Sequence, residues 1–114
     1  MPDDPPSIRH QAAILARRKN ARVVTFSPDS PCDWRPQMVV NPEDGQPFTE
    51  PAAWNLIAEL LEGGEPMECV ELAQPLGKTG YVLLPSLGGR KVYIKFQLGG
   101  GKIIGRSFHY SRVA

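Results

Sequence analysis

Two alternating runs, joined by three glycines near the C-terminus, constrain the fold more than any other feature of this sequence. Residues 91–98 and residues 102–110 are separated only by Gly99, Gly100 and Gly101. In the first run, apolar side chains occupy every second position: Val92, Ile94, Phe96 and Leu98. A period of two is typical of a strand with one buried face, and a short glycine turn favours an antiparallel hairpin. We therefore predict that residues 91–98 and 102–110 are paired strands.

Polar side chains of this hairpin are predicted to share one face. In the first strand Tyr93, Lys95 and Gln97 alternate with the apolar residues, and in the second strand Ser107 and His109 share a side. Because residues on neighbouring strands meet across the sheet, we expect Tyr93, Lys95, Ser107 and His109 to gather on the face away from the core.

Arg106 interrupts the order of the second strand. Strict alternation places Ile104 and Phe108 on the core side, Ile103 and Gly105 on the polar side, and Arg106 with Phe108. Either Arg106 occupies a β-bulge or its side chain extends past the sheet edge. The sequence leaves both possibilities open.

The remainder of the chain predicts an α+β fold. Residues 8–20 have the spacing of an amphipathic helix, and Thr49 can cap a second helix that ends at Gly63. Further short strands are expected at residues 23–26, 37–40, 70–72 and 81–84. With 114 residues, the chain predicts a single domain over residues 1–114, in which helices pack on one face of a curved antiparallel sheet with a C-terminal β-meander.

Prolines mark two segments of this domain that are not regular elements. Residues 1–6 combine three prolines with two aspartates, which predicts a disordered lead-in. Residues 27–48 are predicted to form a proline-rich loop, pinned to the body by Trp34 and Phe48.

Composition excludes several classes of protein. The chain has no apolar run of the length that a membrane span needs, and its N-terminus carries acids where a signal peptide is basic, so we expect a cytoplasmic protein. Only Cys32 and Cys69 are present. Two cysteines without a close pair predict reduced thiols rather than a disulfide scaffold or a zinc site.

The net charge of +1 conceals a strong segregation along the chain. Residues 1–22 hold five basic and two acidic side chains, and residues 23–77 hold only Arg35 against ten acids. Residues 78–114 hold seven basic side chains and no acid. The last third can therefore present a positive surface to a polyanion, while the acidic middle screens it or contacts a basic partner.

A phenol, an ammonium and an imidazole on a rigid sheet suit RNA cleavage without a metal. The reaction needs a base for the ribose 2′-hydroxyl, an acid for the leaving 5′-oxygen and positive charge on the phosphate. His109 can serve as acid or base, Lys95, Arg90 and Arg106 can hold phosphate, and Tyr93 can orient the phosphate or stack on a base. The competing interpretation is an ordinary sheet with a polar outer face and one structural histidine.

The same strands carry a family resemblance. The segment Val92-Tyr93-Ile94-Lys95-Phe96-Gln97-Leu98, followed by Ile103-Ile104-Gly105-Arg106-Ser107-Phe108-His109, resembles the C-terminal strands of the MqsR toxins. Those bacterial toxins belong to the RelE-like ribonucleases. The resemblance implies a helix-on-sheet fold, cleavage of mRNA and neutralisation by a cognate antitoxin.

The resemblance also implies roles for individual residues. Tyr93 matches the active-site tyrosine of the family, and His109 stands where the family has a C-terminal catalytic lysine. The family's other functional lysine and glutamine have no counterpart in residues 65–68. Lys78 or Arg90, from later in the chain, would have to substitute for them. The proline-rich loop is also unlike that family, which favours a related but distinct group.

These arguments combine into one functional hypothesis and one alternative. The hypothesis is a toxin-like endoribonuclease that needs no metal or other cofactor, binds RNA and is neutralised by an antitoxin protein. Its predicted catalytic residues are Tyr93, Lys95 and His109, and its predicted RNA contacts are Lys78, Arg90, Gln97, Arg106 and Ser107. The alternative is a noncatalytic module that binds nucleic acid or a protein through the same basic face.

Overall fold

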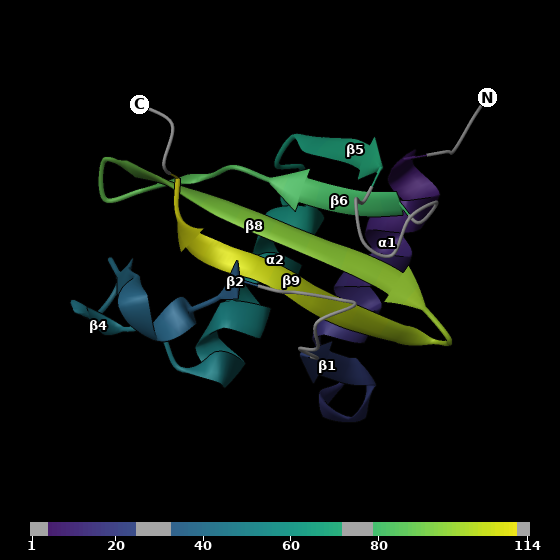
Figure 1. The fold of residues 1–114 in the computed structure, drawn as a ribbon, viewed down its shortest axis with the longest axis horizontal. Coiled ribbons are helices and arrows are strands. Elements are labelled where there is room, and N and C mark those ends of the chain that lie inside the picture. Colours follow the sequence, from purple (N-terminus) through teal and green to yellow (C-terminus); the bar gives the residue numbers. More distant parts are fainter. Residues whose placement is uncertain (1–4, 25–32, 72–78, 112–114) are drawn as a thin grey trace.

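A computed structural model describes residues 5–24, 33–71 and 79–111 as an α+β fold, with two α-helices behind a mostly antiparallel sheet (Figure 1). The helices are α1 (Pro5–Ala16) and α2 (Glu50–Glu62), and 3-10 turns occupy Lys19–Ala21 and Pro36–Met38. The strands are β1 (Arg22–Val24), β2 (Asp33–Trp34), β3 (Val40–Asn41), β4 (Gln46–Pro47), β5 (Met67–Glu71), β6 (Thr79–Leu83), β7 (Ser86–Leu87), β8 (Arg90–Gly99) and β9 (Lys102–Tyr110). No described helix has both the length and the apolar character needed to cross a membrane.

The main sheet has the strand order β1-β9-β8-β6-β5, with β2 also paired to β9 and β7 paired to β8. From β5 onward its neighbours are antiparallel, which confirms the predicted C-terminal meander. The sheet is mostly antiparallel rather than antiparallel throughout, because β1 and β2 both run parallel to β9. Parallel neighbours need a long connection, and here the chain returns through α2 and the other strands before β9 forms.

The predicted hairpin is present and joins β9 to β8 from Val92 onward. Pairing extends from Val92 opposite Tyr110 to Gly99 opposite Lys102. Gly100 and Gly101 close the turn with φ angles of 60° and 75°. These positive angles are accessible to glycine without steric cost, which explains the glycine run.

A β-bulge in β9 settles the position of Arg106. Lys95 lies opposite Ser107, but the next residue of β8, Phe96, lies opposite Gly105, so Arg106 is the additional residue. The extra residue reverses the alternation on its N-terminal side. Ile103 is therefore fully buried and Ile104 is only partly buried, the opposite of the strict alternation predicted for this strand.

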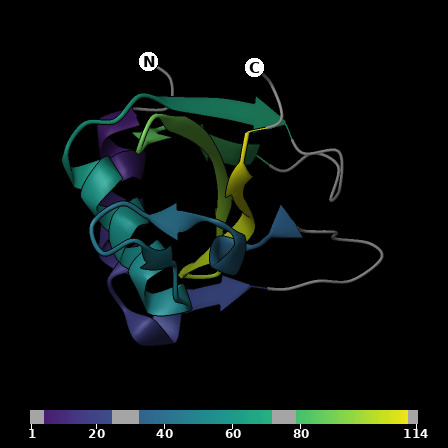
Figure 2. The same ribbon diagram turned by 90° about the vertical axis from the view of Figure 1, so that its left-hand side faces the viewer.

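Both helices cover the same face of the sheet, as Figure 2 shows. Trp54, Ile57 and Leu61 of α2 are fully buried in one core with Phe96 and Phe108 of the sheet. The opposite side of the sheet, called the polar face below, carries the side chains of β8 that alternate with this core.

The second helix begins and ends as its sequence predicts. The Thr49 hydroxyl accepts a hydrogen bond from the Ala52 N–H at 3.2 Å, and Gly63 follows the last helical residue. A capping hydroxyl satisfies a backbone donor that has no partner within the helix.

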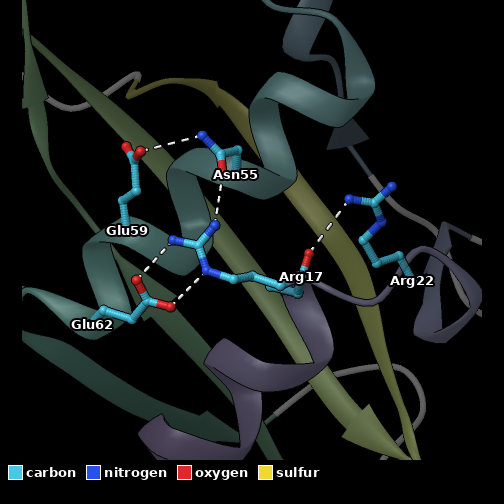
Figure 3. A network of polar contacts seen from close by, with 6 residues as sticks. Arg17, Arg22, Asn55, Glu59 and Glu62 are labelled. Carbon is cyan, nitrogen blue, oxygen red and sulfur yellow. Dashed lines mark hydrogen bonds and ion pairs between the residues drawn. The ribbon is translucent and has the colours of Figure 1, made fainter.

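Basic side chains of α1 and of the residue that follows it hold the two helices together (Figure 3). The Arg17 guanidinium donates to both carboxylate oxygens of Glu62, at 2.7 and 2.8 Å, and to the Asn55 side chain at 2.9 Å. The Arg9 guanidinium donates to the Leu61 carbonyl. Arg9 and Arg17 thus bind α2.

Three boundaries differ from the sequence-based expectation. Helix α1 spans Pro5–Ala16 instead of residues 8–20, so it includes Pro5 and Pro6, which were assigned to the lead-in. Proline is tolerated in a first helical turn, whose N–H groups have no partner within the helix. Of the strand expected at residues 37–40, residues 37 and 38 belong to the 3-10 turn Pro36–Met38, and only Val40 lies in a strand, β3. The rest of the predicted loop that the structure describes contains β2, β3 and β4, while residues 1–4 and Cys32 lie outside the described residues.

Candidate functional site

On the polar face, paired residues from five strands form one row across the sheet. Asp33 of β2 lies opposite Ser107, Ser107 opposite Lys95, Lys95 opposite Val82, and Val82 opposite Glu68. This row, called the central row below, crosses the sheet from one acidic residue to the other with Lys95 between them. Tyr93 and His109 form the neighbouring pair on β8 and β9.

His109 is held by three contacts. Its ring stacks on Tyr93, with centroids 5.5 Å apart and an angle of 18° between the planes. Its Nδ1 lies 2.8 Å from the Tyr110 carbonyl oxygen, and its Nε2 lies 3.3 Å from Asp33 Oδ2. A carbonyl oxygen and a carboxylate oxygen both only accept hydrogen bonds, so the ring satisfies both contacts as the imidazolium, which carries an N–H on each nitrogen.

Asp33 is a site residue that the sequence analysis missed. Its second carboxylate oxygen accepts a hydrogen bond from Arg35 Nε at 2.5 Å, so the carboxylate is fixed between Arg35 and His109. Asp33 falls within the predicted proline-rich loop, where two strand residues are too few to show alternation. Trp34 was the available signal, because a tryptophan pinned to the core directs its strand neighbour to the opposite face.

Trp34 fixes β2 against the sheet. Its ring lies 4.9 Å from the Trp54 ring and 5.5 Å from the Phe108 ring, measured between centroids. A Cβ placed on Gly105 would lie 2.7 Å from two Trp34 ring atoms. The absence of a side chain at Gly105 therefore allows Trp34 to pack closely, and this packing sets the position of Asp33.

Positive charge is concentrated at Lys95 in the central row and at the nearby Arg106. Burial lowers the pKa of Lys95, and the nearby Arg106 guanidinium lowers it further. Arg106 itself is only 5% exposed. The Arg106 charge thus disfavours the protonated form of Lys95, and an anion bound beside Lys95 would offset this effect.

Tyr93 is kept in its phenol form. Burial raises its pKa, and the negative charge of Glu68 raises it further. The group is therefore a hydrogen-bond donor across the neutral range and not a phenolate base.

The structure does not bring every predicted residue to this site. The Arg90 guanidinium lies 3.6 Å from the centre of the Tyr110 ring, and Arg90 has the parity of buried Val92 rather than that of Tyr93. Gln97 shares the parity of Lys95 and lies opposite Ile104, farther along β8. Lys78 lies outside the described residues.

The site is thus an imidazole, a carboxylate, a phenol and two cations on the polar face. Within residues 5–24, 33–71 and 79–111, no three histidine, cysteine, aspartate or glutamate side chains are grouped so as to hold a metal ion. Comparisons with protein family models, curated proteins and solved structures return no match for this chain.

Proposed function

We propose that this chain is a toxin-like endoribonuclease that cleaves mRNA by acid–base chemistry on the polar face. One observation carries the proposal: His109 is held between Asp33 and Tyr93, beside the paired cations Lys95 and Arg106. A proton-transfer group next to partly dehydrated positive charge is the combination that phosphodiester cleavage requires.

The proposed reaction uses the ribose as its own nucleophile. The 2′-hydroxyl loses its proton, the 2′-oxygen attacks phosphorus, and the bond from phosphorus to the 5′-oxygen breaks. The products are a 2′,3′-cyclic phosphate and a 5′-hydroxyl, and the 5′-oxygen receives one proton in exchange for the one removed. His109 Nε2 moves a proton in this exchange, while the bond from Nδ1 to the Tyr110 carbonyl fixes the ring orientation.

The remaining residues act on the phosphate and on the imidazole. Lys95 and Arg106 oppose the negative charge that increases on the phosphate oxygens in the transition state. Tyr93 donates a hydrogen bond from its phenol, and Asp33 is a positioning residue for His109. Ser107, opposite Lys95 in the central row, supplies a hydroxyl at the same position of the sheet.

The toxin part of the proposal is supported by the resemblance of residues 92–98 and 103–109 to the MqsR toxins. Tyr93, Lys95, Ser107 and His109 all lie within those two segments. A cytoplasmic toxin of this type needs a protein antitoxin, so we propose that the chain acts together with one. Expression of the chain alone is then expected to arrest bacterial growth, and the His109→Ala variant is expected to permit it.

The cleavage test compares the two histidines of the chain. Purified wild-type protein is incubated with RNA in EDTA beside His109→Ala and beside His10→Ala, whose histidine is exposed on α1. Loss of an acid or base is expected to slow cleavage roughly 100-fold to 10,000-fold in His109→Ala. The His10→Ala variant should cleave at the wild-type rate.

Three results would contradict the proposal. If His109→Ala melts at the wild-type temperature and cleaves RNA as fast as the wild type, His109 is not a catalytic residue. If wild-type protein binds RNA without cleaving it, the polar face belongs to a noncatalytic binding module. Cleavage that stops in EDTA would exclude the metal-independent mechanism.

A further inference from the structure

A pocket of about 250 Å³ adjoins the proposed catalytic residues on the polar face. It lies between β5, β6 and β8, and its lining residues are Pro66, Met67, Glu68, Val82, Leu84 and Tyr93. Tyr93 therefore belongs both to this pocket and to the stack with His109. The pocket is the continuation of the proposed active site toward β5.

The pocket is apolar except for one charged group. Val82 is buried, Leu84 keeps 40% of its surface exposed, and the Tyr93 ring forms an aromatic wall. Pockets for drug-sized ligands begin at roughly 300 Å³, so this one suits a smaller, flat ring system. The Glu68 carboxylate offers two hydrogen-bond acceptors and no donor when ionised.

Its place in the sheet relates the pocket to the phosphate site. Val82, a pocket residue, lies directly opposite Lys95 in the central row, and Glu68 lies opposite Val82 on the next strand. A nucleotide with its phosphate at Lys95 can thus direct its base toward β5, against Tyr93. Stacking on an aromatic side chain is a common way for proteins to bind a base of single-stranded RNA.

We propose that this pocket binds a guanine base next to the scissile phosphate and that Glu68 determines this preference. The inference rests on the proposed function, because the proposed function supplies the phosphate site at Lys95. Guanine presents two adjacent donors, N1–H and the 2-amino group, which match the two oxygens of one carboxylate. Adenine and cytosine present an amino group beside an acceptor nitrogen, and uracil presents one N–H between two carbonyls, so each would place an acceptor near the carboxylate.

The binding test uses oligonucleotides that cannot be cleaved. Short single strands with 2′-deoxyribose lack the attacking hydroxyl, and guanine is compared with hypoxanthine, which differs only in lacking the 2-amino group. Loss of one hydrogen bond to a charged acceptor is expected to weaken binding by about 10-fold or more. The Glu68→Gln variant should bind both strands equally.

A matched control is available on the same strand. Glu71 is exposed at the end of β5 and does not line the pocket, so Glu71→Gln removes the same charge without changing the pocket. We expect Glu71→Gln to retain the wild-type preference for guanine. Equal binding of guanine and hypoxanthine by the wild type would overturn the inference, and so would an equal loss of preference in both variants.

Mapping the cleavage sites separates this inference from the proposed function. RNA cleaved by the wild type without any preference for guanine leaves the ribonuclease in place and overturns the role of Glu68. Selective binding of guanine through Glu68, without cleavage of RNA, supports the pocket and overturns the catalytic function. Cleavage beside guanine that becomes indiscriminate in Glu68→Gln supports both.

Discussion

At the scale of single residues, Lys95 shows a conflict between stability and the proposed function. Burial and the Arg106 guanidinium both disfavour its charged form, which lowers its pKa from the ordinary 10.5. The folded state is therefore penalised at every pH below the lowered pKa, and the penalty disappears as the pH rises from that value toward 10.5. A chain selected only for stability would not place an ammonium group at this position.

We expect Lys95→Met to raise the melting temperature at pH 7 and to reduce cleavage of RNA. The unbranched apolar side chain of methionine keeps most of the packing while the desolvated charge is removed. Loss of one group that stabilises transition-state charge typically costs roughly 100-fold to 1,000-fold in rate. Melting curves of both proteins between pH 7 and pH 10.5 check the stability effect, because the advantage of the variant should shrink as Lys95 loses its proton in the wild type.

A variant that melts below the wild type across this pH range would show that Lys95 makes a favourable contact in the folded state. An unchanged rate of cleavage would show that its charge does not act on the phosphate. Tyr93 titrates in both proteins, so its raised pKa cancels in the comparison.

At the scale of secondary structure, alternation predicts the hairpin but not its irregularity. The positions of Tyr93, Lys95, Ser107 and His109 on one face follow from a period of two, and the structure brings these residues together. The same rule assigns Ile103 to the wrong face. A bulge changes the count of residues on one strand only, so a single strand read by itself does not reveal where the count changes.

Short strands explain the other omissions. Strand β2 has two residues, fewer than are needed to show a period, so only its apolar neighbour Trp34 indicates the face of Asp33. The pocket at Glu68 depends on the order β5-β6-β8, which brings together residues distant in the sequence. Helix α2 was predictable because its cap, its apolar spacing and its terminal glycine are all local signals.

The contact between β2 and β9 predicts a specific effect of a small substitution. Gly105→Ala would place a methyl group 2.7 Å from the Trp34 ring, so we expect Trp34 to shift. Overpacking of this kind destabilises a core by about 1–3 kcal/mol. Because β2 also holds Asp33 against His109, cleavage should fall together with the stability.

Gly99→Ala is the matched control, because a Cβ there meets no atom within 4 Å. Urea denaturation of the two variants measures the difference in free energy of unfolding. Equal stabilities would mean that Trp34 can move at little cost and that β2 is not fixed by this contact.

At the scale of the whole molecule, acidic and basic residues that are separated along the sequence lie close together in the fold. The acids Asp33 and Glu68 stand at the two ends of the central row, on the same face as Lys95. Two other cations of the basic C-terminal third, Arg90 and Lys102, are engaged elsewhere. Arg90 lies over Tyr110, and Lys102 Nζ donates to the Asn20 carbonyl at 3.0 Å. On the polar face of the described residues, Lys95 and Arg106 therefore lie between two negative groups, and the exposed Lys91, which has the parity of Lys95 on β8, adds a cation on the same side.

This arrangement predicts a shallow dependence of RNA affinity on salt. Each phosphate neutralised on a single strand contributes about −0.7 to the slope of log affinity against log salt, so contacts from Lys95 and Arg106 alone give a slope of about −1.4. Affinity should then fall roughly sevenfold between 50 and 200 mM salt. A broad basic surface would lose far more, because it would release more counterions.

Fluorescence titration of a 2′-deoxy oligonucleotide at several salt concentrations measures this slope. Lys95→Met should make it less negative by about 0.7, since one phosphate contact is removed. Lys102→Met should leave the slope unchanged, because the Lys102 ammonium is bound to Asn20 at the far end of the hairpin. An affinity that does not respond to salt would mean that phosphate is not the group recognised. A slope much steeper than that of two contacts would mean that cations other than Lys95 and Arg106 also bind the strand.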